Sequence, residues 1–191
     1  MIHITSLEEI ESVLLRADET VDYFERRDPR FMDMTKSWLV EIEKALTNSR
    51  LPVAAEVAGL RALLISAERG SVPEWLQITG ARTARKVKSA ITAEVLRRAA
   101  VAVNDSLKGS VSTVLEAEKL ARQLLAAGRR KSIVPAETAG LPHEAWLKAV
   151  YKSISDDPEL GAGTAHLTGL VGFYDALILL DRASSAVSES G

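Results

Sequence analysis

Cysteine is absent from this chain and aromatic residues are scarce, which limits both its chemistry and its fold. None of the 191 residues is Cys, and only 5% are Phe, Trp or Tyr. Without thiols the chain has no disulfide framework, no thiolate metal site and no cysteine nucleophile. Aromatic side chains favour strands, whereas the abundant Ala and Leu favour helices. The composition therefore predicts helix packing rather than a sheet.

Long hydrophobic runs are also absent. The longest apolar stretch covers residues 167–180 and is interrupted by Asp175. It is shorter than the roughly 20 apolar residues that a helix needs to cross a bilayer. Residues 1–9 lack the basic region and the apolar run of a signal peptide. We therefore expect a soluble, cytoplasmic protein that does not enter a membrane.

Charge is sorted along the chain, although the net charge is only −2. Residues 80–131 hold twelve Lys or Arg against four Asp or Glu, a net of +8. Residues 1–79 and residues 132–191 each have a net of −5. Such a basic middle between acidic flanks indicates either a surface for an anionic partner or charge matching between packed helices, where most pairs stay solvated.

The first predicted helix carries a narrow apolar seam. Ser6 and Glu9 have the spacing of a capping box, which places the helix start at Ser6. The apolar residues then recur in a 3-4 pattern typical of a coiled coil: Leu7, Ile10, Leu14, Ala17, Val21 and Phe24. If the second helix does not cover this seam, a dimer would bury it. Self-association is therefore an expectation of the sequence.

Two more helices follow after short loops. Asp28-Pro29 restarts the chain as a helix that stops near Asn48, because proline is tolerated in a first turn. A third helix begins at Pro52 and ends at a glycine in position 70, a residue suited to the position after a helix. Loops this short force neighbouring helices to run antiparallel. The sequence thus predicts an antiparallel three-helix unit over residues 6–69.

The remaining helices are predicted at residues 73–76, 81–108, 110–127, 142–155 and 164–183. Gly109-Ser110 and Gly128 are expected to end helices, and residues 129–141 to form a long linker. The last helix is apolar nearly all round, so we expect it at the centre of the core.

These patterns predict an all-α protein, a single-domain helical bundle of six or seven helices. The domain is expected to span residues 1–186, with residues 187–191 as a disordered tail. Within it lie the three-helix unit (6–69), a basic helical middle (73–131) and the C-terminal helices (142–186).

The residues that could carry chemistry form no recognisable site. His3, His143 and His166 lie in none of the spacings that bind metals in helical proteins. Asp175 is unusual because a carboxyl group on the most apolar helix needs a partner to be buried. A structural ion pair with one of the central bases is favoured over a catalytic acid. We predict no catalytic residue, no metal and no cofactor, and hence a non-enzymatic protein.

The candidate binding residues come from the basic middle: Arg82, Arg85, Lys86, Arg97, Arg129, Arg130 and Lys131. On a helical wheel Arg82, Lys86 and Arg97 lie within about 60° of one another. The cluster at 129–131 follows Gly128 and is expected to be free to move, or else to stabilise a helix end as cations do. Residues 73–86 also faintly resemble a helix-turn-helix.

Two functions remain open at this point. The favoured hypothesis is a non-enzymatic helical interaction protein, an adaptor, regulatory or assembly subunit that binds a protein partner or a second copy of itself. The alternative is a nucleic-acid-binding protein that uses residues 80–131 to bind DNA or RNA. The two differ in whether the basic residues share one exposed face or are neutralised by neighbouring acids.

Overall fold

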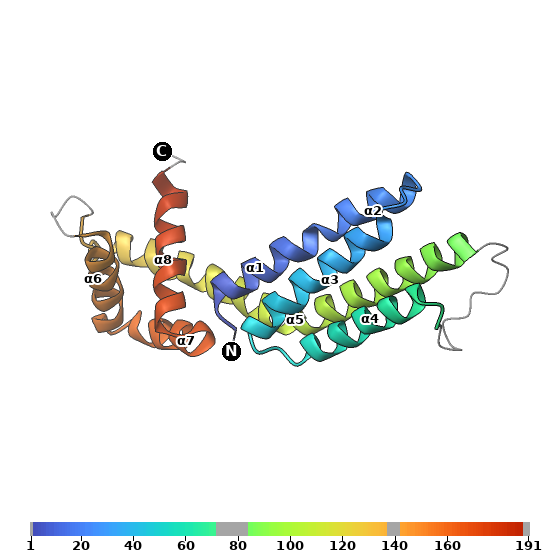
Figure 1. Cartoon of the computed structure of the whole chain (residues 1–191). Coiled ribbons are helices and arrows are strands. Elements are labelled where there is room, and N and C mark those ends of the chain that lie inside the picture. The colour runs from blue at the N-terminus through green and yellow to red at the C-terminus, as the bar shows by residue number, and fades with distance from the viewer. Residues whose placement is uncertain (1, 72–83, 137–141, 189–191) are drawn as a thin grey trace. The chain divides into compact units, whose positions relative to one another are not determined.

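A computed structural model describes residues 2–71, 84–136 and 142–188 of the chain (Figure 1). Within these ranges the chain is helical and contains no strand, which confirms the all-α class. The short helix and the helix-turn-helix candidate expected from residue 73 lie largely outside the described residues. The helices are α1 (Ile4–Leu15), α2 (Ala17–Glu25), α3 (Phe31–Asn48), α4 (Val53–Glu68), α5 (Ala84–Arg130), α6 (His143–Asp156), α7 (Gly161–Val171) and α8 (Phe173–Ser188).

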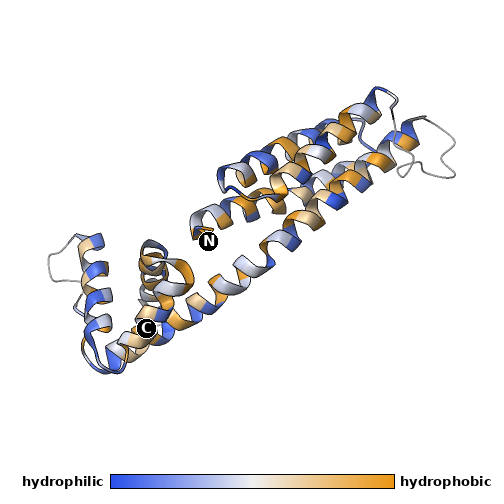
Figure 2. Cartoon of the chain, turned by 90° about the horizontal axis from the view of Figure 1, so that it is seen from below, coloured by the Kyte–Doolittle hydropathy of each residue, from blue (hydrophilic) through white to orange (hydrophobic). Residues whose placement is uncertain are grey.

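The helices form two compact units, which are described separately. The N-terminal unit comprises Thr5–Lys108, and the C-terminal unit comprises Met1–Ile4 together with Gly109–Gly191. The long helix α5 contributes its first part to the N-terminal unit and the rest to the C-terminal unit. The helices carry both hydrophilic and hydrophobic residues along their length, as expected of elements with one buried face (Figure 2).

The N-terminal unit contains the antiparallel arrangement that the sequence predicts. α2 packs on α3, α3 packs on α4, and the first part of α5 lies alongside them (Figure 1). The core of this unit contains the buried side chains of Leu39, Ile42, Leu46, Leu64 and Ile91. Gly70 has a φ of +91°, as expected for a glycine that follows a helix end.

The first predicted helix is interrupted at Arg16, where α1 ends and α2 begins. The carbonyl oxygen of Val13 accepts a hydrogen bond from the indole Nε1 of buried Trp38, at 2.8 Å. It also accepts one from the backbone N–H of Arg16, at 3.2 Å, in a tighter turn than that of an α-helix. A side chain from a neighbouring helix thus stabilises a break that the seam pattern does not reveal.

The seam itself is covered only in part. Leu7, Ile10 and Ala17 are buried within the chain, whereas Val21 and Phe24 are exposed to 39% and 43%. The first half of the seam therefore faces its own core and is not available for a dimer. Its last two residues stay on the surface.

The start of α1 was predicted two residues too late. The helix begins at Ile4 rather than Ser6, and the Ile4 N–H donates to Oδ2 of Asp175 at 3.2 Å. The ring of His3 lies 3.3 Å from the same oxygen. The partners of Asp175 are thus His3 and a backbone N–H, and not one of the central bases. This carboxyl group acts as a cap supplied by a distant part of the chain.

The expected stop at Gly109-Ser110 is wrong, because α5 is one continuous helix of 47 residues. A Cβ added at Gly109 would meet nothing within 4 Å. A glycine inside a helix lowers its stability by about 1 kcal/mol relative to alanine but does not end it. Burial of the apolar face of the helix, with Leu107 before the glycine and Ala117 after it in the core, outweighs that cost.

Gly128 also does not end a helix, and it serves another purpose. α5 continues to Arg130, and Gly128 is buried under the side chains of Val134 and Ile154. A Cβ added there would lie 2.9 Å from Cγ2 of Val134 and 3.3 Å from Cγ1 of Ile154. The glycine allows the chain after α5 to fold back closely on the helix.

The last predicted helix is two helices, α7 and α8, separated by Gly172. Gly172 has a φ of 86° and a ψ of 166°, a conformation open essentially only to glycine. The buried residues of α8 form much of the core of the C-terminal unit, including Ala176, Leu179 and Leu180. No single helix among those described is long and apolar enough to cross a membrane, and α7 and α8, which meet that requirement only together, are bent by 114° at their junction.

Candidate protein-binding pocket

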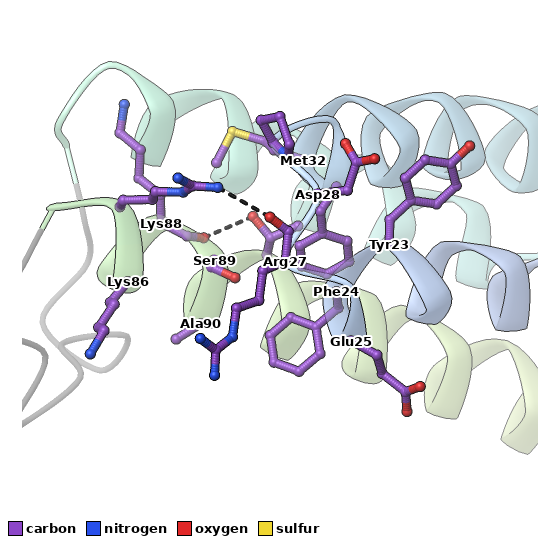
Figure 3. Close-up of a pocket in the computed structure, with 14 residues that line it drawn as sticks. Tyr23, Phe24, Glu25, Arg27, Asp28, Met32, Lys86, Lys88, Ser89 and Ala90 are labelled. Atoms are coloured by element: carbon purple, nitrogen blue, oxygen red, sulfur yellow. Dashed lines mark hydrogen bonds between the residues drawn. The ribbon is translucent and has the colours of Figure 1, made fainter.

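A surface pocket of about 1030 Å³ lies in the N-terminal unit, where α2 ends, α3 begins and α5 begins. We call it the α2–α5 pocket. Figure 3 shows the side chains around it. The lining residues are Tyr23, Phe24, Glu25, Arg27, Asp28, Pro29, Phe31, Met32, Arg85, Lys86, Lys88, Ser89, Ala90 and Thr92.

The turn between α2 and α3 shapes one side of the pocket. Arg27 has a φ of 55°, which reverses the chain after α2. Asp28 then accepts the backbone N–H of Arg30 at 2.8 Å and is held by the guanidinium of the same residue at 2.8 and 3.1 Å. These bonds lower the pKa of Asp28 from 3.8 to about 2. The charge of this carboxylate is therefore compensated within the turn.

Apolar side chains line the pocket beside this turn. The rings of Phe24 and Phe31 lie 5.3 Å apart and tilted, and Phe31, the first residue of α3, is buried. Phe24 is 43% exposed, and Met32 is half-buried. An aromatic ring that packs on a buried ring and is partly exposed to solvent is typical of an interface anchor.

Two cations at the start of α5 are fixed by neutral acceptors. Arg85 donates to the backbone carbonyl of Arg27 at 3.1 Å, and Lys88 donates to the backbone carbonyl of Glu68 at 3.0 Å. Glu68 is the last residue of α4, where a cation is favourable, and Arg27 lies in the turn that follows α2. A carbonyl has no net charge, so these hydrogen bonds hold the side chains without cancelling their positive charge.

The exposed aromatic ring and two further cations share one side of the pocket. In Figure 3 the side chains of Phe24, Arg27, Lys86 and Glu25 all extend toward the lower side of the view, with Lys86 and Glu25 at opposite ends of the row. Lys86 and Glu25 are both exposed. The arrangement presents an apolar surface flanked by positive charge.

The structure brings together only two of the seven predicted binding residues. Arg85 and Lys86 line the α2–α5 pocket, whereas Arg82 lies outside the described residues. Arg97 is not in the pocket: its Nε and Nη2 bind Glu94 at 3.0 and 2.8 Å. Arg98 binds the same carboxylate at 2.7 Å, and the hydrogen bonds from the two arginines lower the pKa of Glu94 to about 2.

The cluster at 129–131 belongs to the C-terminal unit and is not a mobile arm. Arg129 and Arg130 lie in the last turn of α5, where the helix dipole favours cations. Lys131 binds Asp157 at 2.8 Å and Glu159 at 2.8 Å, and these bonds raise its pKa. The expectation of a freely moving cluster is wrong for Lys131.

Many of the remaining bases have a carboxylate partner close by. The ion pairs are Arg97–Glu94, Arg98–Glu94, Lys108–Asp105, Arg122–Glu118 and Lys131–Asp157. Four of these five pairs are three or four residues apart on α5 itself, so they neutralise charge locally rather than against the acidic flanks. The start of α5 differs, since Arg85 and Lys88 bind carbonyls instead.

Twelve of the fourteen lining residues were not among the predicted binding residues, and they include Phe24, Arg27 and Lys88. The sequence placed Phe24 at the end of the apolar seam and Lys88 on another face of the helical wheel. What unites them is the approach of the α2–α3 turn to α5, a contact between segments nearly 60 residues apart. The pair Arg26-Arg27 directly before Asp28-Pro29 is the one sequence feature that marks this turn as basic.

No protein-family model, no curated protein and no solved structure matches this chain. What the α2–α5 pocket binds is therefore inferred from its own shape, exposure and charge. Its side chains supply apolar contact, fixed positive charge and hydrogen-bond donors, which together suit recognition of a ligand.

Proposed function

We propose that this protein is a non-enzymatic helical interaction protein whose N-terminal unit binds a protein partner at the α2–α5 pocket. The observation that carries the proposal is the exposed ring of Phe24, which rests on Phe31 and is flanked by cations of the pocket. Aromatic residues and arginines are the side chains most enriched in the energetic centres of protein interfaces. An adaptor, regulatory or assembly role would follow from such binding.

Local charge pairing favours a protein partner over a nucleic acid. A duplex is bound by a continuous row of cations that contact successive phosphates. Along α5, however, Arg97, Arg98, Lys108 and Arg122 each bind a carboxylate of the same helix. Arg85 and Lys88, which bind neutral carbonyls, lie in the pocket beside an apolar surface. DNA or RNA binding is therefore the second candidate.

Site-specific photo-crosslinking in cells of the source organism tests the proposal. Phe24 is replaced by the photoreactive amino acid benzoylphenylalanine, and a matched chain carries it at Val40, which is 50% exposed in α3 and lies outside the pocket. We expect a discrete protein adduct from position 24 that is absent from position 40. The adduct should disappear when Lys86→Glu is added to the chain.

The other outcomes contradict the proposal in distinct ways. An adduct that is removed by nuclease would establish the nucleic-acid alternative. A protein adduct that forms equally from both positions, or that survives Lys86→Glu, would show that the pocket is not the binding surface. The absence of any adduct from position 24 would refute binding at this site.

A further inference from the structure

We infer that Arg85 is a positioning residue of the α2–α5 pocket, which promotes binding through Phe24 by holding the turn between α2 and α3. This inference rests on the proposed function and concerns how the binding surface is kept in place. It changes the role of one residue that the sequence assigned to binding. Two observations carry it, the backbone conformation of the turn and the hydrogen bond that Arg85 donates to it.

The turn after α2 has a backbone conformation that residues with a side chain rarely adopt. Arg27 has a φ of 55°, which lies in the left-handed region. Its N–H donates to the carbonyl of Phe24 at 3.0 Å, and the N–H of Asp28 donates to the carbonyl of Tyr23 at 2.9 Å. These are the bonds of a Schellman motif, in which glycine is the usual residue at the position of Arg27. Such a conformation persists in another residue where the surrounding structure holds it.

Arg85 supplies a holding contact from a segment far along the chain. It is the second residue of α5, and its Nη2 donates to the carbonyl of Arg27 at 3.1 Å (Figure 3). Arg27 is therefore bound on both sides, because its N–H binds Phe24 and its carbonyl binds Arg85. The start of α5 is thus joined to the backbone of Phe24 through one residue.

The same turn determines how the two phenylalanine rings of the pocket meet. The N–H of Phe31 donates to the carbonyl of Asp28 at 3.2 Å, so both rings are attached to the turn. The ring centroids lie 5.3 Å apart, with Phe31 buried and Phe24 partly exposed. Because Phe31 is fixed in the core, a change in the turn moves the ring of Phe24 relative to it. Arg85 therefore controls how the exposed ring is presented.

Fluorine NMR of the full-length chain tests this inference without a partner. The chain contains three phenylalanines, at positions 24, 31 and 173, so labelling with 4-fluorophenylalanine gives one signal for each. Phe173 lies in α8 of the C-terminal unit and serves as an internal reference. Phe24→Leu and Phe173→Leu each remove one signal and thereby assign all three. Because no partner is present, a residue that only contacts the partner cannot move a signal.

Substitutions of Arg85 separate its hydrogen bond from other effects. Arg85→Met keeps the length of the side chain but has no donor, so we expect the Phe24 signal to move by more than its linewidth and the Phe173 signal to stay in place. Arg85→Lys keeps a donor, as a lysine of the same helix does toward another backbone carbonyl, and should restore the position of the Phe24 signal. Arg130→Met makes the same change in the last turn of α5, outside the pocket, and should leave the Phe24 signal unchanged.

Photo-crosslinking then measures the effect of these variants on binding. With benzoylphenylalanine at position 24, Arg85→Met should lower the yield of the protein adduct by about fivefold, the change that loss of one hydrogen bond of average net strength causes. Arg85→Lys should keep the yield of the wild type.

The outcomes separate the inference from the proposed function. A Phe24 signal that stays in place in Arg85→Met would overturn the inference, and so would Arg85→Lys that behaves like Arg85→Met. In either case a protein adduct from position 24 that is lost in Lys86→Glu would leave the proposed function standing. A moved Phe24 signal with an undiminished adduct would show that binding does not depend on the position of the turn. Equal movement of all three signals would show a general structural role, and each of these two results would also overturn the inference.

Discussion

The buried carboxyl group of Asp175 offers a sharp test of the fold of the C-terminal unit. Asp175 is 3% exposed, and its Oδ2 accepts the N–H of Ile4, which is itself buried. Asp175→Ala removes the acceptor and leaves this N–H without its partner. An unsatisfied buried donor costs about 1–3 kcal/mol, and loss of a helix cap about 0.5–2 kcal/mol. We expect the free energy of unfolding to fall by about 2 kcal/mol.

Two companion variants separate the hydrogen bond from other effects. Asp175→Asn keeps an oxygen acceptor in the same place and should cost less than half as much as the alanine variant. His3→Ala removes a side chain that is 75% exposed, so it should change stability by no more than about 0.5 kcal/mol.

Urea denaturation followed by far-ultraviolet circular dichroism measures these differences. An alanine variant as stable as the wild type would refute the capping role of Asp175. An asparagine variant as unstable as the alanine variant would show that the acceptor oxygen is not the relevant group.

Three further predictions follow from the same structure. Gly172→Ala should destabilise the chain by about 1–3 kcal/mol, because the backbone there suits only glycine, whereas Gly109→Ala should stabilise it by about 1 kcal/mol. Thermal denaturation of both variants measures the two effects, and a stabilised Gly172 variant would contradict the break between α7 and α8. Trp38→Phe should cost about 1 kcal/mol through loss of the 2.8 Å bond to Val13, and an unchanged urea midpoint would contradict this. The folded-state pKa of Glu94 is lowered from 4.5 to about 2. Its contribution to the free energy of unfolding, under about 1 kcal/mol for a surface pair, is therefore present above pH 4.5 and is lost as the pH falls toward 2. An NMR titration of the carboxyl carbon with a midpoint near the usual value would refute this.

Helices with a regular apolar stripe could be predicted well from the sequence. The end of α3 at Asn48 and the position of α4 match the prediction closely. In both helices a single buried face and a turn residue at each end determine the structure, and these signals are local. The all-α class follows from the same periodicity.

Two of the errors share one physical cause, which is contact between distant segments. Arg16 interrupts the first helix where Trp38 binds a carbonyl of the last turn of α1, and Gly128 is needed because Ile154 packs against it. Neither contact leaves a pattern near the residue concerned. The prediction also gave too much weight to Gly109 as a helix stop, because packing of the residues around a glycine determines whether the helix continues.

The candidate site could be predicted only on the side that belongs to α5. The sequence pointed to Arg85 and Lys86, but the helical wheel grouped Lys86 with Arg82 and Arg97, and Arg97 binds Glu94 instead. The other half of the pocket comes from the α2–α3 turn. The sequence predicted that Phe24 would contact a partner helix as part of the apolar seam. Its exposure in the α2–α5 pocket moves that hypothesis from the seam to the pocket.

Chemical-shift mapping by NMR tests the central claim most directly. The labelled full-length chain is titrated with the partner protein identified by crosslinking at position 24, and the backbone amide signals are followed. The account predicts that the largest shifts cluster at Phe24, Arg27, Lys86 and Ser89, and that Lys86→Glu abolishes them. Shifts centred on residues 122–131, or unchanged signals at the α2–α5 pocket while the partner binds, would contradict it.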